Sequence, residues 1–586
     1  MRSRPLVALV ALVVAACNGR PRAWEIPVEG ERVDERGEAI AEIELGAGAP
    51  EVQKGGVLQI PSRHTFDALV ATLHQAKTRK GLKGVFVTFG VAPLGWARAH
   101  EVGAALEELR RKVPVVCHAD AWDNGAYAAA ARGCTVVAMS EGGEVELTGP
   151  ATVIPYAREL LVDKLKAQVD ILQVGKFKGA AEPLTRDGPS EEYRASIEGA
   201  LSAIRVGYQK ALTERGVDGL VGTGPYTAKG AMEHKLVDLL ADKQGARDET
   251  RKRAGIKHVE VVFGPGAGAR HKLGLGDVLE LLTLPQGESS ARPHVRLVRL
   301  HGEIVLGAES GGLLGGPAGI VARKVVERAH ALTDDPNVRA VVLRIDSPGG
   351  SALGSDLAWI ALKALRDKKP LIVSVGELAA SGGYYLASAA NRIFAEPESI
   401  VGSVGVVGGK ISFGGTFAQV GIHTASFGDK RAAQLMSMTE PWDDATRAQL
   451  LTTMQDIYGL FLRRIADGRG KRESDFQNAV EGRVFGGEKA KALGLIDDLG
   501  GLGDALAAAK TAARLPADAP VVVDETSSFF ELLQGSDDAN ALTMTLAGAL
   551  GGEAAALERW ARVFIAASRG PGFAVVAMLP TPLLVR

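Results

Sequence analysis

The stretch 375–385, VGELAASGGYY, contains the first residue of this chain whose chemistry draws notice. The apolar run Leu371–Val375 predicts a buried strand, and the small residues after it present one hydroxyl, Ser381, before two glycines and an apolar helical run. A serine at a strand-to-helix turn can expose its Oγ as a nucleophile, and glycines leave room for a substrate backbone. The alternative is a glycine turn in which Ser381 only caps the following helix.

A nucleophilic serine needs a base, and histidine is the usual one. The C-terminal half holds four histidines: His294, His301, His330 and His423. None lies in a loop that obviously faces Ser381, and only His423 remains a candidate for its base. A lysine can serve instead if burial lowers its pKa enough to leave it neutral. Lys178, in VGKFKGAAEPLTRDGPS, follows an aromatic residue and precedes small residues. Its alternative role is a solvated lysine near the start of a helix.

A second loop of the C-terminal half could stabilise a reaction intermediate. The apolar run AVVLRI is followed by SPGGS at 347–351, which offers backbone N–H groups with little side-chain obstruction. An oxyanion hole needs such donors, and loss of one costs roughly 100- to 1000-fold in rate.

The elements that must position these residues occur twice, at an offset of roughly 250–260 residues. AVVLRIDSPGG matches GVFVTFGVAPL, ASGGYYLASAANRIFAEP matches DNGAYAAAARGCTVVAMS, and GRVFGGEKAKALGLIDDL matches TGPYTAKGAMEHKLVDLL. The first half places Asn124 where the second has Ser381, and the second places Arg431 where the first has Lys178. Because arginine does not lose its proton in a protein, it cannot be the base. The two halves are therefore predicted to build one composite site.

Apolar strand-like runs alternate with amphipathic helical runs in both halves, which predicts parallel α/β units. The expected division is a leader at 1–16, a tether with one or two short strands at 17–54, the repeats at 55–285 and 290–515, and a C-terminal extension at 516–586. Expected elements include strands at 84–89, 294–305 and 340–345 and helices at 97–112, 193–215, 355–368, 450–468 and 542–567.

The composition of the 586 residues, with 46% apolar and 23% charged residues, is typical of a globular protein with ample core. The net charge of −1 gives no reason to expect a nucleic-acid partner. Cys117 and Cys134 border neighbouring apolar runs, and either a disulfide or packing as small apolar residues suits them. The sequence shows no Cys-His-carboxylate cluster at ligand spacing, so neither a metal nor another cofactor is predicted.

The N-terminus has the features of an export signal. Arg2 and Arg4 precede the apolar run Leu6–Ala16, which is too short to span a bilayer and suits a signal-peptide core. The run ends at Cys17 in VAAC, which resembles a bacterial lipobox; the alternative is an ordinary signal peptide with an incidental cysteine. Several acyl chains on Cys17 would anchor the protein stably, so an anchored protein of the bacterial cell envelope facing the periplasm is expected.

Together, RIDSPGG, AASGGYYLASAANRIFAEPESIVGSVGV and GKFKGAAEPLTRD resemble the long, duplicated form of bacterial signal peptide peptidase A, a Ser-Lys protease family of the cell envelope. The resemblance implies Ser381 as nucleophile, Lys178 as general base and Ser403 as the residue that orients the lysine. It also implies the N–H groups of Gly350 and Gly382 as oxyanion donors.

The implied fold is a tandem duplication of a ClpP/crotonase-like domain, an α/β superhelix of repeated β-β-α units. The implied substrates are cleaved signal peptides and other apolar or unfolded peptides. The family's ring-like assemblies imply a homotetramer for a duplicated chain. Small or aliphatic residues flank the site and predict an apolar pocket: Ala379, Ala380, Val404, Val406 and Val407.

Two features depart from that family. The long form is held by an N-terminal transmembrane helix, whereas this chain ends its apolar run at a lipobox. The usual tyrosine before the base lysine is Phe177 here. Competing hypotheses are a crotonase-type binder of acyl thioesters, which needs no nucleophilic serine, and an inactive envelope scaffold.

Overall fold

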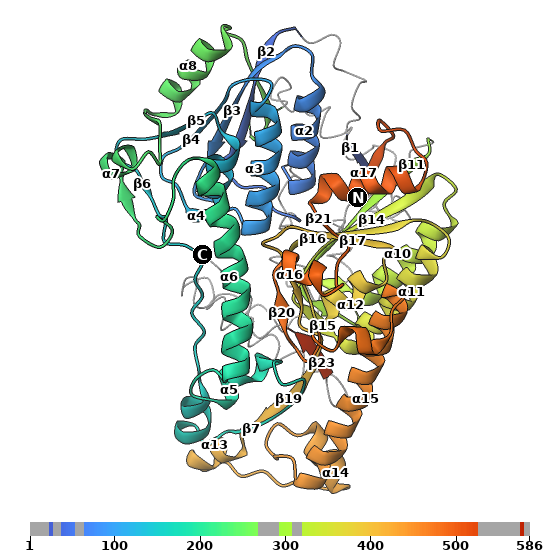
Figure 1. Cartoon of the computed structure of the whole chain (residues 1–586). Helices are drawn as coiled ribbons and strands as arrows, with labels where there is room; N and C mark the ends of the chain where they lie inside the picture. Colours follow the sequence, from blue (N-terminus) through green and yellow to red (C-terminus); the bar gives the residue numbers. More distant parts are fainter. Residues whose placement is uncertain are drawn as a thin grey trace, which may run out of the picture.

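Runs of valine, isoleucine and leucine form two parallel sheets, each at the centre of one α/β unit (Figure 1). The structure is a computed structural model that describes residues 23–26, 37–52, 64–265, 267, 292–307, 319–524 and 575–578. Strands buried on both faces read as near-continuous apolar runs, because helices cover both sides of a parallel sheet.

The N-terminal unit has a six-stranded sheet in the order β10-β2-β3-β4-β5-β9, with all neighbours parallel. Its strands are β2 (Ala39–Leu45), β3 (Leu82–Phe89), β4 (Val115–Ala119), β5 (Val136–Met139), β9 (Leu239–Leu240) and β10 (Val259–Phe263). Its main helices are α2 (Phe66–Thr78), α3 (Trp96–Arg110), α4 (Asn124–Gly133), α6 (Glu191–Glu214), α7 (Ala228–Glu233) and α8 (Lys243–Ala254).

The C-terminal unit repeats this plan, with the parallel strands in the order β22-β11-β14-β16-β17-β21. These are β11 (His294–His301), β14 (Val338–Ser347), β16 (Leu371–Ala380), β17 (Arg392–Ala395), β21 (Asp498–Leu499) and β22 (Val521–Asp524). The matching helices are α10 (Ala322–Asp334), α11 (Ala352–Arg366), α12 (Gly382–Ser388), α15 (Asp444–Arg469), α16 (Gly487–Ala492) and α17 (Leu502–Ala512).

Equivalent contacts recur in the two units. Tyr127 donates a hydrogen bond from its hydroxyl to the carbonyl of Leu236 at 2.7 Å, and Tyr384 donates one to Leu495 at 2.8 Å. The antiparallel pair β6 (Glu144–Val145) and β8 (Tyr226–Thr227) has its counterpart in β18 (Ile400–Gly402) and β20 (Val484–Phe485). The tandem duplication predicted from the sequence is thus visible in the order of strands and in individual contacts.

Two predicted boundaries are wrong. The N-terminal repeat does not begin at 55, because a short strand of the segment 17–54, β2, lies inside the N-terminal sheet between β10 and β3. The C-terminal repeat does not end at 515, because β22 adds a buried parallel strand beside β11. A further strand, β1 (Ala23–Ile26), pairs antiparallel with β22. In both cases a strand is held by backbone pairing with a neighbour that is distant in sequence.

The predicted strand 294–305 is divided at Gly302, whose φ of 94° turns the chain. The residues after the turn enter a smaller sheet in the order β13-β12-β15-β23-β19-β7. Its strands are β12 (Ile304–Val305), β13 (Ile320–Val321), β15 (Gly349–Ser351), β23 (Val575–Met578), β19 (Val406–Ser412) and β7 (Gln168–Val174). Because β7 comes from the N-terminal half and β19 from the C-terminal half, this sheet joins the two units (Figure 1).

The two units also share a core. One cluster of buried apolar residues includes Leu69 and Val102 of the N-terminal unit and Ile372 and Ala505 of the C-terminal unit. Within the N-terminal unit, Cys117 of β4 and Cys134 at the end of α4 form a disulfide. Among the described residues, no helix is both long enough and apolar enough to cross a membrane. Cys17 and the predicted helix 542–567 lie outside the described residues.

Candidate active site

The register of two parallel strands places Ser381 beside Ser403. β16 and β18 are paired with Ala380 opposite Gly402, and each serine follows its strand directly. The N–H of Ser381 donates to the carbonyl of Gly402 at 2.7 Å. Both serines have positive φ, 53° and 56°, which is uncommon for a residue with a side chain and recurs at functional sites.

A second pairing brings Lys178 to the same place. β7 runs antiparallel to β19 with Val174 opposite Val406, so the turn after β7 arrives next to Ser403. The Nζ of Lys178 lies 2.8 Å from the Oγ of Ser381, 2.9 Å from the Oγ of Ser403 and 2.8 Å from its carbonyl oxygen. The separation of 2.8 Å between the Nζ of Lys178 and the Oγ of Ser381 is that of a hydrogen bond, and all three residues belong to one chain.

The lysine is held in a dry environment. Its exposed fraction is 1%, and burial lowers the pKa of Lys178 well below the usual value of 10.5. A Cβ on Gly405 would lie 3.1 Å from the Cδ of Lys178, so the glycine lets the lysine stem pass. Burial without an acidic partner favours the neutral form of an amine, because its charge would have to be desolvated.

The hydroxyl of Ser381 does not cap α12, because its side chain makes no capping hydrogen bond. The capping alternative therefore fails for Ser381, whereas the hydroxyl of Ser351 does cap α11 by accepting the N–H of Gly354 at 3.1 Å. Gly382 begins α12, where the first N–H groups have no partner within the helix. A Cβ on Gly382 would lie 3.2 Å from the Cα of Gly349, so α12 packs directly on the SPGG loop.

The other proposed oxyanion donor, Gly350, lies in the short strand β15 with a φ of 152°. A Cβ there would lie 2.1 Å from the carbonyl oxygen of Ile304, so the neighbouring strand β12 leaves room only for glycine. On its other side, β15 pairs antiparallel with β23, which also pairs with β19. The space between β15 and β19 is therefore one strand wide and accepts an extended segment.

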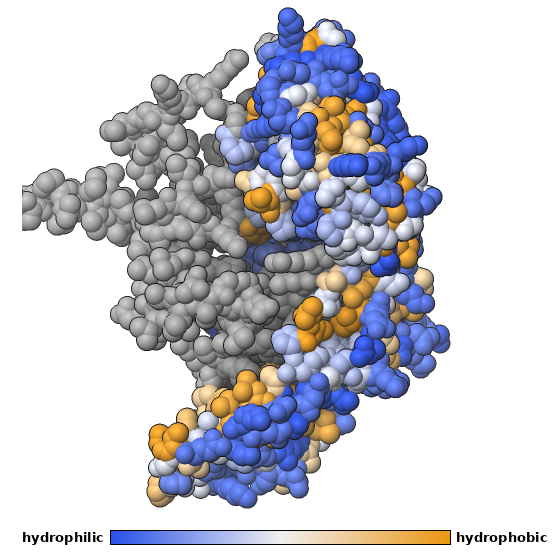
Figure 2. Space-filling model, turned by 90° about the vertical axis from the view of Figure 1, so that its left-hand side faces the viewer, coloured by the Kyte–Doolittle hydropathy of each residue, from blue (hydrophilic) through white to orange (hydrophobic). Residues whose placement is uncertain are grey.

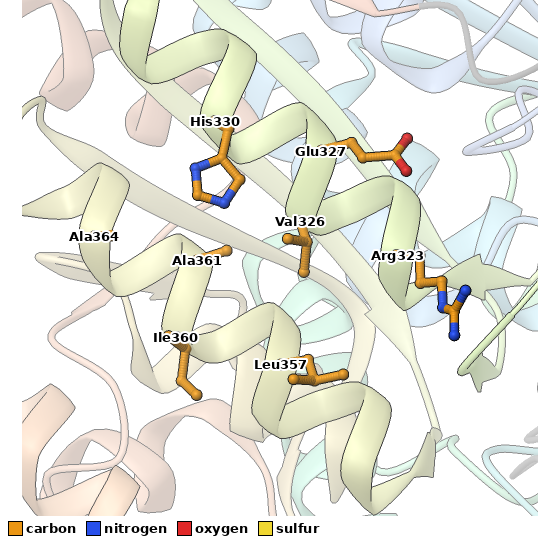
Figure 3. Close-up of a pocket in the computed structure, with 8 residues that line it drawn as sticks. All are labelled: Arg323, Val326, Glu327, His330, Leu357, Ile360, Ala361 and Ala364. Carbon is orange, nitrogen blue, oxygen red and sulfur yellow. The ribbon is translucent and has the colours of Figure 1, made fainter.

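The histidines of the C-terminal half lie elsewhere. His294 is buried in β11 and contacts the carbonyl of Arg292, while His301 faces Asp346 at 3.6 Å. His330 lines a groove of about 360 Å³ between α10 and α11, together with Leu357 and Ile360 (Figure 3). His423, the histidine left open by the sequence, is exposed, and the Ser381 hydroxyl is hydrogen-bonded to Lys178.

The counterpart of Ser381 in the N-terminal unit is occupied in a different way. Asn124 donates from its amide to Glu146 at 3.0 Å and to Thr148 at 2.9 Å, and accepts the N–H of Gly149. These contacts hold Asn124 within the N-terminal unit. Because a side-chain amide is not a nucleophile, the N-terminal unit has none at this position. Among the described residues, no group of three or more histidine, cysteine, aspartate or glutamate side chains could hold a metal ion.

One sequence expectation is corrected here. The small and aliphatic residues that flank the site are at most 9% exposed, so they form the wall behind the site and no open pocket: Ala379, Ala380, Val404, Val406 and Val407.

The sequence prediction missed two features. Arg344, in RIDSPGG, reaches across to Glu51 at 2.8 Å and Glu101 at 2.7 Å in the N-terminal unit, behind the site. The segment 481–484 lies against the turn that carries Lys178. The string GRVF at 482–485, which corresponds to TGPY in the first repeat, marks this segment in the sequence but by itself predicts only the duplication.

Comparison with known proteins shows the family to which the chain belongs. The family model described as Peptidase family S49 matches residues 107–257 and 363–516, which together exceed half of the chain. Protease 4 of Salmonella typhi is 28% identical over 483 residues, which cover 78% of this chain and 75% of that protein.

Two further relatives match smaller shares. The chloroplastic serine protease SPPA of Arabidopsis thaliana is 28% identical over 62% of this chain and 54% of its own length. The putative signal peptide peptidase SppA of Enterococcus faecium is 29% identical over 33% of this chain and 56% of its own length. A ClpP1 mutant of Listeria monocytogenes superposes with a TM-score of 0.23 at 15% identity, over 36% of this chain and 94% of that chain, a likeness too low to bear on the fold. The two stretches matched by one peptidase model, one in each repeat, show that this chain belongs to peptidase family S49.

Proposed function

We propose that this serine peptidase of family S49 cleaves peptide bonds with Ser381 as nucleophile and Lys178 as general base. The observation that carries the proposal is the 2.8 Å separation of the Ser381 Oγ from the Nζ of a buried lysine. The proton of the Ser381 hydroxyl passes to the neutral amine while Oγ attacks the peptide carbonyl carbon. The N–H groups of Gly350 and Gly382 are the proposed donors to the resulting oxyanion.

The same lysine completes the reaction. The ammonium of Lys178 gives its proton to the departing amine, which leaves an acyl ester on Ser381. A water molecule then gives a proton to Lys178 and attacks the ester carbon, which releases the new carboxyl end and restores the serine. Ser403 orients the amine through its two oxygens throughout.

The proposed substrates are extended, apolar or unfolded peptides, among them cleaved signal peptides. The extended strand β23, paired with β15 on one side and β19 on the other, supports an extended backbone in the site, since a substrate strand in the place of β23 would gain main-chain hydrogen bonds on both sides. The proposed location is the bacterial cell envelope, with the protein anchored through lipid on Cys17 and facing the periplasm. The lipobox in VAAC supports that anchor.

We also propose that copies of the chain assemble into a homotetramer. β7 and β19, which pair with each other, each have an equivalent segment in the opposite repeat. The equivalent of β19 lies around 149–155 and that of β7 around 421–427, and neither belongs to a strand of the described structure. Apolar side chains gather at the lower end of the molecule, the end that β7 and α13 (Gly414–Gln419) occupy (Figure 2). Val153 and Phe427, one in each unpaired segment, are 93% and 92% exposed. A second copy that repeats the contact would cover both.

A serine-directed fluorophosphonate probe tests the proposed chemistry. The wild-type chain is expected to be labelled, while Ser381→Ala and Lys178→Ala lose labelling by at least about 1000-fold, as removal of a nucleophile or base does elsewhere. Ser388→Ala is the matched control, because Ser388 is buried at the far end of α12 and its hydroxyl donates to the carbonyl of Tyr385. Equal labelling of wild type and Ser381→Ala, with signal peptides left uncut, would show an inactive scaffold; undiminished labelling of Lys178→Ala at neutral pH would place the base elsewhere.

A further inference from the structure

The segment Glu481–Val484, which leads into β20, touches both walls of the site. The N–H of Phe177, next to the base, donates to the carbonyl of Glu481 at 2.8 Å. Two residues later, the carbonyl of Arg483 accepts the N–H of Ser403 at 2.6 Å. One short piece of backbone is thus bonded to the lysine turn of the N-terminal unit and to the serine loop of the C-terminal unit.

Gly482 lies between these two bonds, in direct contact with the base. Its N–H donates to the carbonyl of Val404 at 2.7 Å, and its φ is 86°. A Cβ at this position would lie 2.4, 2.6 and 2.7 Å from the N, Cα and Cβ of Lys178. A Cβ atom essentially never lies within 3.0 Å of atoms outside its own stretch of chain, and backbone atoms cannot rotate away, so a side chain at 482 must push Lys178 from its place.

The side chain of Arg483 fixes the same turn from outside. Its guanidinium carbon lies 4.1 Å from the ring centre of Phe177, and one of its nitrogens donates to the carbonyl of Asn478 at 3.1 Å. A cation over an aromatic face is attracted by the electron-rich face of the ring. Arg483 therefore holds the turn through its side chain and Ser403 through its carbonyl.

The segment is itself anchored to the long helix of each unit. The N–H of Glu481 donates to the hydroxyl of Tyr458 in α15 at 3.2 Å. The N–H of Val484 donates to the hydroxyl of Ser196 in α6 at 3.1 Å. Because hydrogen bonds to these helices hold both ends of the segment, they also hold Gly482 and Arg483 in place between them.

We propose that Gly482 and Arg483 are positioning residues of the peptidase, which hold Lys178 against Ser381 and keep water from its amine. This inference rests on the proposed function, because it gives Lys178 the role of base. Misplacement of a reacting group by about 1 Å can cost on the order of 100-fold in rate. A displaced amine also meets water, which restores the charged form and moves the working range to higher pH.

The test is the rate at which the probe labels Ser381 in the full-length chain, measured across pH, with KM for a peptide substrate measured in parallel. Gly482→Ala is expected to be labelled about 100-fold more slowly at pH 7, with its rate rising only at higher pH and KM within about threefold of wild type. Gly470→Ala is the matched control: Gly470 has a φ of 61°, and an added Cβ there meets nothing within 4 Å. It shares the backbone strain without the contact to Lys178.

Labelling of Gly482→Ala at the rate and pH profile of Gly470→Ala would overturn the inference, as would a loss confined to KM. If Gly482→Ala does not fold, Arg483→Ala decides the question: about 10-fold slower labelling is expected, recovered in part by Arg483→Lys, which keeps a cation over Phe177. Wild-type behaviour of Arg483→Ala would then contradict the proposal. A wild-type chain not labelled at Ser381 would instead overturn the proposed function itself.

Discussion

When the amine of Lys178 is neutral, it can form one hydrogen bond with each of the three oxygen atoms around it. A neutral amine has two N–H groups and one lone pair. Ser403 offers two acceptors, its carbonyl at 2.8 Å and its hydroxyl at 2.9 Å. The lone pair is then left for the hydroxyl of Ser381 at 2.8 Å, which is the arrangement a general base needs.

The pH dependence of the reaction follows from the buried lysine. Burial lowers the pKa of Lys178 well below 10.5, so the amine is neutral above that lowered pKa and charged below it. Only the neutral form accepts the serine proton, so the labelling rate is expected to rise with pH through the lowered pKa and level off well short of pH 10.5. A rate that still rises in proportion to hydroxide near pH 10 would contradict a buried neutral base.

The replacement Ser403→Ala tests the orientation of the amine. It removes one acceptor, so the amine can turn away, and labelling of Ser381 is expected to slow by about 10- to 100-fold. Its pH profile should not move to higher pH, because burial, not the Ser403 hydroxyl, lowers the pKa of Lys178. Ser412→Ala is the control, since Ser412 is buried in β19 but donates to Glu440. Wild-type rates for Ser403→Ala would remove Ser403 from the mechanism.

Among the secondary-structure elements, β14 links the site to the interface between the two units. Its residue Arg344 lies behind the SPGG loop, only 2% exposed, with its guanidinium carbon 5.1 Å from the ring centre of Phe66. Burial alone would lower the pKa of Arg344, but the carboxylates of Glu101 and Glu51 outweigh it and raise that pKa. A charge network of this kind fixes how two elements meet.

The replacement Arg344→Ala would leave Glu51 and Glu101 buried without their cation. Removing one partner of a buried ion pair typically costs about 3–5 kcal/mol, so a clearly lower denaturant midpoint is expected. Arg339→Ala is the control, because Arg339 lies on the same strand but is exposed and should change stability by no more than about 0.5 kcal/mol. Equal midpoints for the two variants would contradict the bridging role of Arg344.

For the whole molecule, the contact between β7 and β19 is heterologous, because different surfaces of the two repeats meet. A heterologous contact that repeats between copies generates a ring if the rotation closes. Each chain uses the contact once internally and leaves one counterpart segment in each unit, around 149–155 and 421–427. Those segments carry Val153 and Phe427, whose exposure a neighbouring copy would relieve.

The oligomeric state provides the measurement. Light scattering after size-exclusion chromatography is expected to give a tetramer for the wild type and smaller species for Val153→Asp and Phe427→Asp, because a charge in a buried apolar contact is strongly unfavourable. Val91→Asp is the control, since Val91 is 100% exposed but lies outside both segments. A tetramer that survives both replacements would place the interface elsewhere, and a monomeric wild type would contradict the assembly.

The local sequence predicted many of the strands and helices, and the reason is physical. Buried parallel strands need apolar runs and strand-to-helix turns need small residues, so β3, β14 and β16 could be recognised from their residues alone. β2, with the sequence AIAEIEL, was expected only as a short strand within a tether, because the glutamates at alternate positions hide that nearly all of its residues are buried. In the structure Glu42 is buried and paired with Arg247, a partner 205 residues away.

The sequence by itself determined the kinds of chemistry available. It places a serine at a glycine turn in the second repeat, where the first has Asn124, and a lysine in the first repeat, where the second has Arg431. These are properties of side-chain identity, which no fold can alter. Only the tertiary structure decided that Lys178 and Ser381, 203 residues apart, lie 2.8 Å from each other. The register of β16 with β18 and of β7 with β19 sets that distance, and Gly482 allows it, because backbone segments remote in sequence must approach more closely than any side chain permits.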